Sequence, residues 1–147
     1  METELTYLLR IVVAGALAAL LGIEREQAHK AAGLRTHMMV GIAAALYTAL
    51  AELAVHTYEG DPEGLRADPI RAIQAVALGV GFLGGGMIVT RQGRQVSGLT
   101  TAASIWATAA IGIAAGLAHY VLAVGATLLQ LLVLRVLVRF DRSDDDD

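Results

Sequence analysis

The chain contains no cysteine and only two prolines, and it has few charged or aromatic side chains. Without cysteine there are no disulfides, thiolate metal sites or cysteine nucleophiles. Charged residues make up 17% of the chain, against roughly 25% in ordinary soluble domains. Hydrophobic residues make up 56%, and the mean hydropathy is +0.59. This composition favours an integral membrane protein over a soluble domain.

Acidic residues are missing from the whole stretch between Asp68 and Asp141. That gap bears on residues 79–88, GVGFLGGGMI, whose first glycines match the spacing of a dinucleotide-binding loop. Such a fold needs a strand before the glycines and an Asp or Glu about 20 residues later for the ribose. Here the glycines lie inside an unbroken apolar segment and no acid follows. Nucleotide binding is therefore not expected.

Apolar segments predict an all-α integral membrane protein, a bundle of about five transmembrane helices. Residues 95–134 would form a single helix about 60 Å long, so they must fold into two spans, with the turn near His119. The expected spans lie near residues 5–23, 36–57, 70–90, 98–118 and 120–138. They form one membrane domain over residues 1–140, followed by an acidic cytoplasmic tail at 141–147.

Lys and Arg are concentrated in the loops at 24–35 and 91–97 and after residue 138. The positive-inside rule then places the N-terminus outside and the C-terminus in the cytoplasm. The first residues, METELTYLLR, are acidic where a signal peptide is basic, so the first span is expected to be retained.

The glycines of the third and fourth spans suit close helix packing, because lipid-embedded helices associate through small residues. Gly81/Gly85 and Gly112/Gly116 each form a small-xxx-small pair. The run Gly84–Gly86 leaves two interpretations open. It is a packing face, or it unwinds the third helix beside a polar pocket.

Ionisable residues within spans are functional candidates by default. Arg10 and Glu52 are expected at similar depth near the outer surface, with His56 one turn beyond Glu52 and Gln74 nearby. Either Arg10 and Glu52 form a buried pair, or each reaches water separately.

A second polar set is expected at the cytoplasmic face, formed by Glu24, Arg25, Glu26, Arg35, Thr36, His37, Thr100, Thr101 and Ser104. Glu24 and Arg35 bracket a loop, and a Glu24–Arg35 pair closing a hairpin is the favoured interpretation. The alternative is a hydrated Mg²⁺ held by the carboxylates. The histidines are too scattered for a metal site or for catalysis, and no basic patch suits nucleic acid. Neither an enzyme nor a cofactor is expected.

Four motifs in order resemble the membrane domain of the MgtC/SapB family: GIERE (22–26), AGLRTHMMVGIAAAL (32–46), GVGFLGGGMI (79–88) and GLTTAASIWATAAIGIAAG (98–116). The resemblance covers residues 7–138. It marks as motif positions Glu24, Arg25, Glu26, Gly33, Leu34, Arg35, Thr36, His37, Gly81, Phe82, Gly84, Gly86, Gly98, Leu99, Thr101, Ala102, Ala103 and Trp106.

The resemblance implies a multi-pass protein of the bacterial inner membrane. It links some members to growth in low magnesium, survival in phagocytes and inhibition of the F-type ATP synthase. Virulence-type members have Asn where Thr100 stands and Cys where Ala107 stands, and they carry a soluble C-terminal domain. A general role in ion homeostasis is therefore expected here.

Two functions follow as hypotheses. The first is a non-enzymatic regulator that docks onto another membrane complex, with the ATP synthase as the implied partner. The second is a small transporter or channel, homo-oligomeric through its small-residue faces, with a broken third helix lining the path.

Overall fold

The computed structural model describes residues 4–58, 68–91 and 95–141. Within them the chain forms five helices, α1 (Glu4–Gln27), α2 (Leu34–Tyr58), α3 (Pro69–Met87), α4 (Leu99–Gly116) and α5 (Tyr120–Asp141). Helices α1 to α4 are long and apolar enough to cross a membrane, and α5 contains a shorter apolar stretch, Tyr120–Val136. The predicted all-α membrane bundle is confirmed.

A short antiparallel hairpin between α3 and α4 was not predicted. It pairs β1 (Val89–Arg91) with β2 (Gln95–Ser97), in the register Val89 to Ser97. Because the hairpin begins at Val89, α3 ends three residues before the predicted end of the third span.

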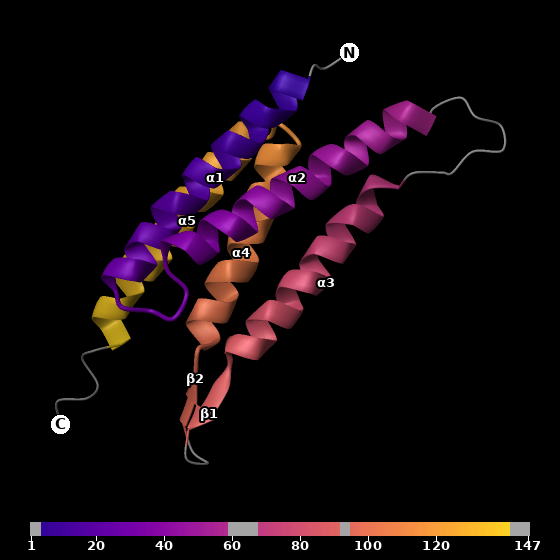
Figure 1. Ribbon diagram of the computed structural model, residues 1–147. Coiled ribbons are helices and arrows are strands. Elements are labelled where there is room, and N and C mark those ends of the chain that lie inside the picture. Colours follow the sequence, from indigo (N-terminus) through magenta and orange to yellow (C-terminus); the bar gives the residue numbers. More distant parts are fainter. Residues whose placement is uncertain (1–3, 59–67, 92–94, 142–147) are drawn as a thin grey trace, which may run out of the picture.

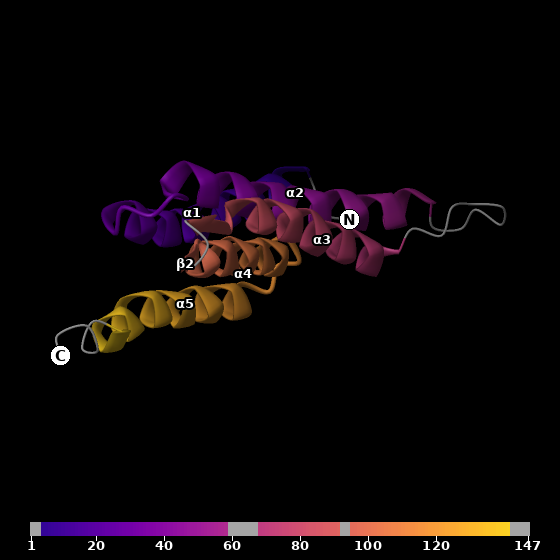
Figure 2. The same cartoon turned by 90° about the horizontal axis from the view of Figure 1, so that it is seen from below.

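Helix α4 is the centre of the bundle and packs against all four other helices. In Figure 2, α1 and α2 lie on one side of α4 and α5 lies on the other, while α3 lies beside α2 and α4. Figure 1 places the start of α1 and the end of α5 at opposite ends of the bundle, as an odd number of crossings requires. Which end faces the cytoplasm stays a prediction. The acidic tail beyond Asp141 lies outside the described residues.

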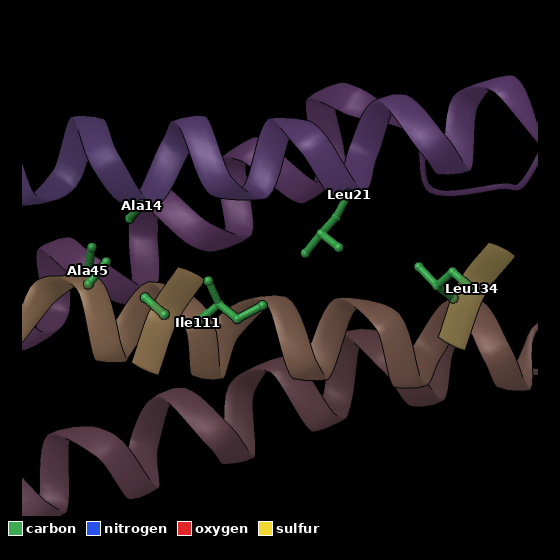
Figure 3. Close-up of a cluster of buried hydrophobic side chains, with 7 residues drawn as sticks. Ala14, Leu21, Ala45, Ile111 and Leu134 are labelled. Carbon is green, nitrogen blue, oxygen red and sulfur yellow. The ribbon is translucent and has the colours of Figure 1, made fainter. Parts of the chain in front are cut away.

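The core is built mainly from small side chains. One cluster joins α1, α2, α4 and α5 and includes Ala14, Leu21, Ala45, Ile111 and Leu134 (Figure 3). Small side chains let the helix backbones approach closely, and close van der Waals packing holds helices together where lipid is as apolar as the side chains themselves.

Helices α2 and α4 approach each other closely. A Cβ on Gly112 would lie 2.5 Å from the Gly41 carbonyl oxygen, and one on Gly116 would lie 3.0 Å from the Ala45 Cα. The Gly112/Gly116 pair therefore packs on α2 within the chain.

The glycine run of α3 does not break the helix, which continues through Gly84–Gly86 to Met87. The interpretation of an unwound third span is therefore wrong. Only Gly84 of this run faces α4, where a Cβ would lie 3.5 Å from the Ala102 Cβ. A Cβ on Gly81, Gly85 or Gly86 would meet nothing within 4 Å, so the Gly81/Gly85 pair is not packed against the described part of the chain.

The role of Gly112 is testable against Gly125, an α5 glycine with open space at its Cβ position. We expect Gly112→Ala to lower the free energy of unfolding by about 1–3 kcal/mol, because the added methyl group forces α2 and α4 apart. Gly125→Ala should change it by less than about 1 kcal/mol. Reversible unfolding in mixed detergent micelles measures both, and equal effects would contradict the close-approach argument.

Candidate functional site

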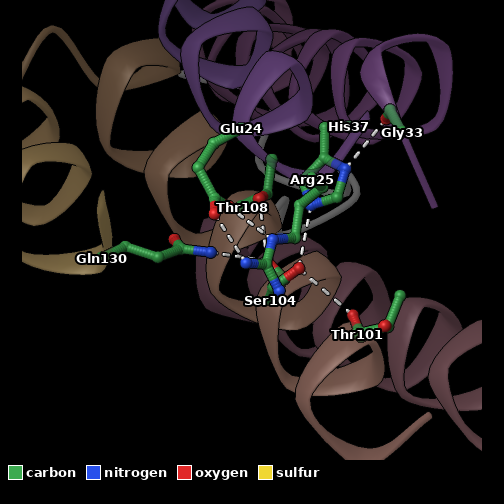
Figure 4. A network of polar contacts seen from close by, with 8 residues as sticks. All are labelled: Glu24, Arg25, Gly33, His37, Thr101, Ser104, Thr108 and Gln130. Carbon is green, nitrogen blue, oxygen red and sulfur yellow. Dashed lines mark hydrogen bonds and ion pairs between the residues drawn. The ribbon is translucent and has the colours of Figure 1, made fainter. Parts of the chain in front are cut away.

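A buried polar cluster lies where α1, α2, α4 and α5 meet. It consists of Glu24, Arg25, His37, Thr101, Ser104, Thr108 and Gln130, and is called here the four-helix cluster (Figure 4). Sequence reasoning had named Glu24, Arg25, His37, Thr101 and Ser104, and the fold brings these together.

The only charges of the cluster belong to neighbouring residues of α1. Arg25 Nη2 donates to Glu24 Oε1 at 2.8 Å, and Arg25 Nε donates to the other carboxylate oxygen. The Arg25 residue is 1% exposed. A charge this deeply buried is tolerable only when an opposite charge accepts its hydrogen bonds.

His37 joins α2 to α4. Its Nδ1 lies 3.0 Å from the Gly33 carbonyl oxygen and its Nε2 lies 2.9 Å from Ser104 Oγ. A carbonyl oxygen only accepts, so Nδ1 carries a proton, and in the neutral ring Nε2 accepts from the Ser104 hydroxyl. His37 thus acts as a hydrogen bonder near the start of α2 and between α2 and α4.

The Ser104 carbonyl joins α4 to α5. It accepts hydrogen bonds from Thr108 Oγ1 at 2.8 Å and from Gln130 Nε2 at 2.9 Å. Sequence reasoning missed both donors. Gln130 carried a usable signal, because it is an amide side chain in an otherwise apolar span, where polar groups need a partner.

Glu26 has a structural task at the α1–α2 turn. Its Oε2 accepts a hydrogen bond from the Leu34 backbone N–H at 2.9 Å, at the start of α2. A Cβ on Gly33 would lie 2.9 Å from that same oxygen, so a larger residue there would displace the Glu26 side chain from this bond. These contacts explain the spacing between GIERE and AGLRTH.

The predicted Glu24–Arg35 pair is wrong. Glu24 accepts from Arg25, and Arg35 is exposed at the start of α2, as is Thr36. Thr100 is exposed as well. The prediction failed because loop length alone does not show which way a side chain points.

The carboxylates of the magnesium hypothesis, Glu24 and Glu26, both accept hydrogen bonds from the protein. Among the residues that the structure describes, no three His, Asp or Glu side chains are grouped to hold a metal ion.

A second polar site lies at the other end of the bundle. Arg10 Nη1 donates to Glu52 Oε2 at 2.8 Å and to the Gly116 carbonyl oxygen at 3.0 Å. The guanidinium carbon also lies 5.1 Å from the Tyr7 ring centroid. The predicted Arg10–Glu52 pair is therefore confirmed, and the bond to Gly116 ties α1 to the end of α4.

The other two residues expected near this pair are both exposed, His56 on α2 and Gln74 on α3. Gln74 takes no part in the Arg10–Glu52 pair, because α1 and α3 lie on different sides of α2.

A third candidate is a shallow groove of about 300 Å³ between α3 and α4. Its wall includes Gly81, Gly84, Gly85, Ala102 and Trp106. The Trp106 residue is 53% exposed beside the open Gly81/Gly85 pair. Gly86, the last glycine of the run, is also exposed.

The fold and these sites define a multi-pass helical membrane protein whose buried charges are paired within the bundle. The model of the MgtC family matches residues 11–143. The chain belongs to the MgtC family, and it is a multi-pass protein of the bacterial inner membrane.

Relatives extend over most of this chain. YhiD of Escherichia coli K12 is 39% identical over 131 residues, which is 88% of this chain and 60% of YhiD. Protein MgtC of Salmonella typhimurium LT2 is 37% identical over 133 residues, 90% of this chain and 52% of that protein. Protein SrpB of Synechococcus elongatus is 38% identical over 141 residues, 90% of this chain and 75% of SrpB.

This chain thus spans between about half and 60% of the length of YhiD and MgtC. No solved structure matches it.

The Arg10–Glu52 pair predicts non-additive variants. We expect Arg10→Met and Glu52→Gln each to lower the free energy of unfolding by about 1–3 kcal/mol. This loss is smaller than for a fully buried ion pair, because the Glu52 side chain is 29% exposed. Arg10→Met should cost more, because the Gly116 carbonyl also loses its donor. The double variant should lose less than the sum, and additive losses in unfolding experiments would contradict the pairing.

The Glu24–Arg25 pair predicts a larger effect. Glu24→Gln leaves the buried Arg25 charge without its counter-charge, so we expect a loss of about 3–5 kcal/mol in the free energy of unfolding. Arg35→Gln, in an exposed position, should stay within about 0.5 kcal/mol. The same unfolding measurement serves both variants. A large loss of unfolding free energy for Arg35→Gln would contradict the assignment of Arg25 as the partner of Glu24.

Proposed function

We propose that this chain is a non-enzymatic membrane protein of magnesium or general ion homeostasis, and that it acts by docking onto another membrane protein. The observation that carries the proposal is the open glycine face of α3, where Gly81, Gly85 and Gly86 meet nothing within 4 Å.

Small residues in a membrane helix let a second helix come close enough for backbone-to-backbone packing. Within this chain, Gly112 and Gly116 are used in that way by α2. The Gly81/Gly85 pair has the same spacing, lies in a continuous helix and has no such neighbour in the described residues. A helix of a partner protein fits this face, and a second copy of the chain is the alternative occupant.

The link to magnesium comes from the relatives. YhiD is named as a candidate magnesium transporter. YhiD and MgtC are both longer than this chain, so the ion and the activity remain proposals for it.

The F-type ATP synthase is the partner that we propose from the family resemblance. Transport by the chain itself is the competing function. Two observations count against transport. The third helix is continuous, and both Arg10 and Arg25 are already paired with carboxylates.

Inverted bacterial membrane vesicles with and without the protein test the proposal. ATP hydrolysis and ATP-driven proton pumping are followed in the same sample. If the protein restrains the synthase, both rates fall together. If pumping falls while hydrolysis holds or rises, the protein leaks ions, and transport replaces docking.

A matched pair of variants locates the docking face. Gly85→Leu places a bulky side chain on the open α3 face without a clash inside the chain, and Gly125→Leu does the same on α5. We expect Gly85→Leu to restore both rates toward the protein-free level, while Gly125→Leu behaves as wild type. Equal behaviour of the two variants would contradict an α3 docking face, and loss of the effect in Glu52→Gln alone would favour transport.

A further inference from the structure

Helix α5 lies at the edge of the bundle. It packs mainly against α4 and α1, on one side of the bundle (Figure 2). Its inward contacts come from few side chains, with Ala123, Thr127 and Leu134 buried. Its outer face is apolar and exposed, and includes Val121, Leu122, Leu128, Leu129 and Leu132.

The polar attachment of α5 is incomplete. Gln130 Nε2 donates to the Ser104 carbonyl, which also accepts from Thr108 Oγ1. Gln130 Oε1 is buried and accepts no hydrogen bond from the described residues. A buried acceptor without a donor destabilises the arrangement that buries it. The Gln130 bond is therefore offset in part by its own amide oxygen.

The turn that precedes α5 is strained. Ala118 has φ 61°, a left-handed conformation, and its N–H donates to the Ala115 carbonyl oxygen at 3.0 Å. The next N–H, of His119, donates to the Ala114 carbonyl oxygen at 2.8 Å, which completes a helix-ending turn that usually has glycine at this position. Alanine there carries the steric cost that glycine avoids.

Gln130 covers the charged part of the four-helix cluster. In Figure 4 its side chain points from α5 toward Glu24 and Arg25. Movement of α5 would uncover this pair together with Thr108 and the Ser104 carbonyl, leaving polar groups that another chain's side chains are able to hydrogen-bond.

We infer that α5 is a movable cover, hinged at Ala118 and latched by Gln130, that opens to expose the four-helix cluster. The strained turn favours opening, because release of the turn relieves the steric strain at Ala118. The incomplete latch keeps the closed state only moderately favoured. The inference does not depend on the proposed function, and its test uses the chain alone in lipid nanodiscs, without a partner.

The absence of cysteine allows spin labels to be placed without background. Labels at Leu129→Cys on α5 and Leu78→Cys on α3 are both on exposed positions, so they leave the core intact. Pulsed electron resonance then measures the α5–α3 separation. A control pair, Leu46→Cys and Leu78→Cys, reports α2 and α3, which should not move.

We expect Gln130→Ala to raise the population with the longer α5–α3 separation by about twofold to fivefold, because the loss of one net hydrogen bond is offset in part by removal of the unpaired Oε1 acceptor. Leu132→Ala, on the exposed face of the same helix, should leave it unchanged. In the Gln130→Ala background, Ala118→Gly should lower the open population by about fivefold or more, because glycine removes the strain at the hinge.

Gln130→Met keeps the side-chain volume and removes the amide, so it should behave like Gln130→Ala. It replaces the alanine variant in the test if circular dichroism shows that Gln130→Ala has lost helical content. The inference is overturned if both Gln130 variants show a single α5–α3 separation. It is also overturned if Leu132→Ala shifts the distribution as much as they do, or if the α2–α3 control pair separates as well.

Discussion

Close approach of α2 and α4 is the constraint on which the rest of the structure depends. Hydrophobic burial does little to join helices that lipid already surrounds, so contact must come from backbones brought near each other. Gly112 and Gly116 allow this approach, while Gly41 allows α2 to come equally close to α1. The approach of α2 and α4 makes α4 the central helix and brings His37 of α2 within hydrogen-bonding distance of Ser104.

The two charge pairs are consequences of that packing. Arg10 and Arg25 lie in the interior because α1 packs against both α2 and α4, and each finds a carboxylate there. Arg10 additionally binds the last carbonyl of α4, which α4 itself leaves without a helical donor. The Arg10–Glu52 pair joins α1 to α2 and fixes how these two helices are placed along one another, a task that uniform apolar surfaces perform poorly.

The glycines divide into two groups with different physical roles. Atoms of α2 fill the space beside Gly112 and Gly116, whereas Gly81 and Gly85 have no neighbour within 4 Å of a Cβ among the described residues. The same small-xxx-small spacing thus serves internal packing in α4 and leaves a free surface in α3. On the other side of α4 from α1 and α2, α5 closes over the four-helix cluster, where Gln130 donates one side-chain hydrogen bond to the Ser104 carbonyl oxygen. The molecule therefore has a rigid centre with its exposed and adjustable parts at the rim.

The sequence by itself determined the membrane-spanning helices and the similar depth of Arg10 and Glu52, because hydropathy depends on composition and because antiparallel spans bring opposite ends to the same depth. That these two side chains pair was one of two alternatives, and the tertiary structure decided it. Only the tertiary structure decided that Glu24 pairs with Arg25, that Gln130 joins the cluster, and that α3 stays helical through Gly84–Gly86 with only Gly84 of this run packed on α4. Those outcomes depend on the rotation of each helix about its axis. That rotation is set by contacts with neighbouring helices, which a single sequence does not reveal.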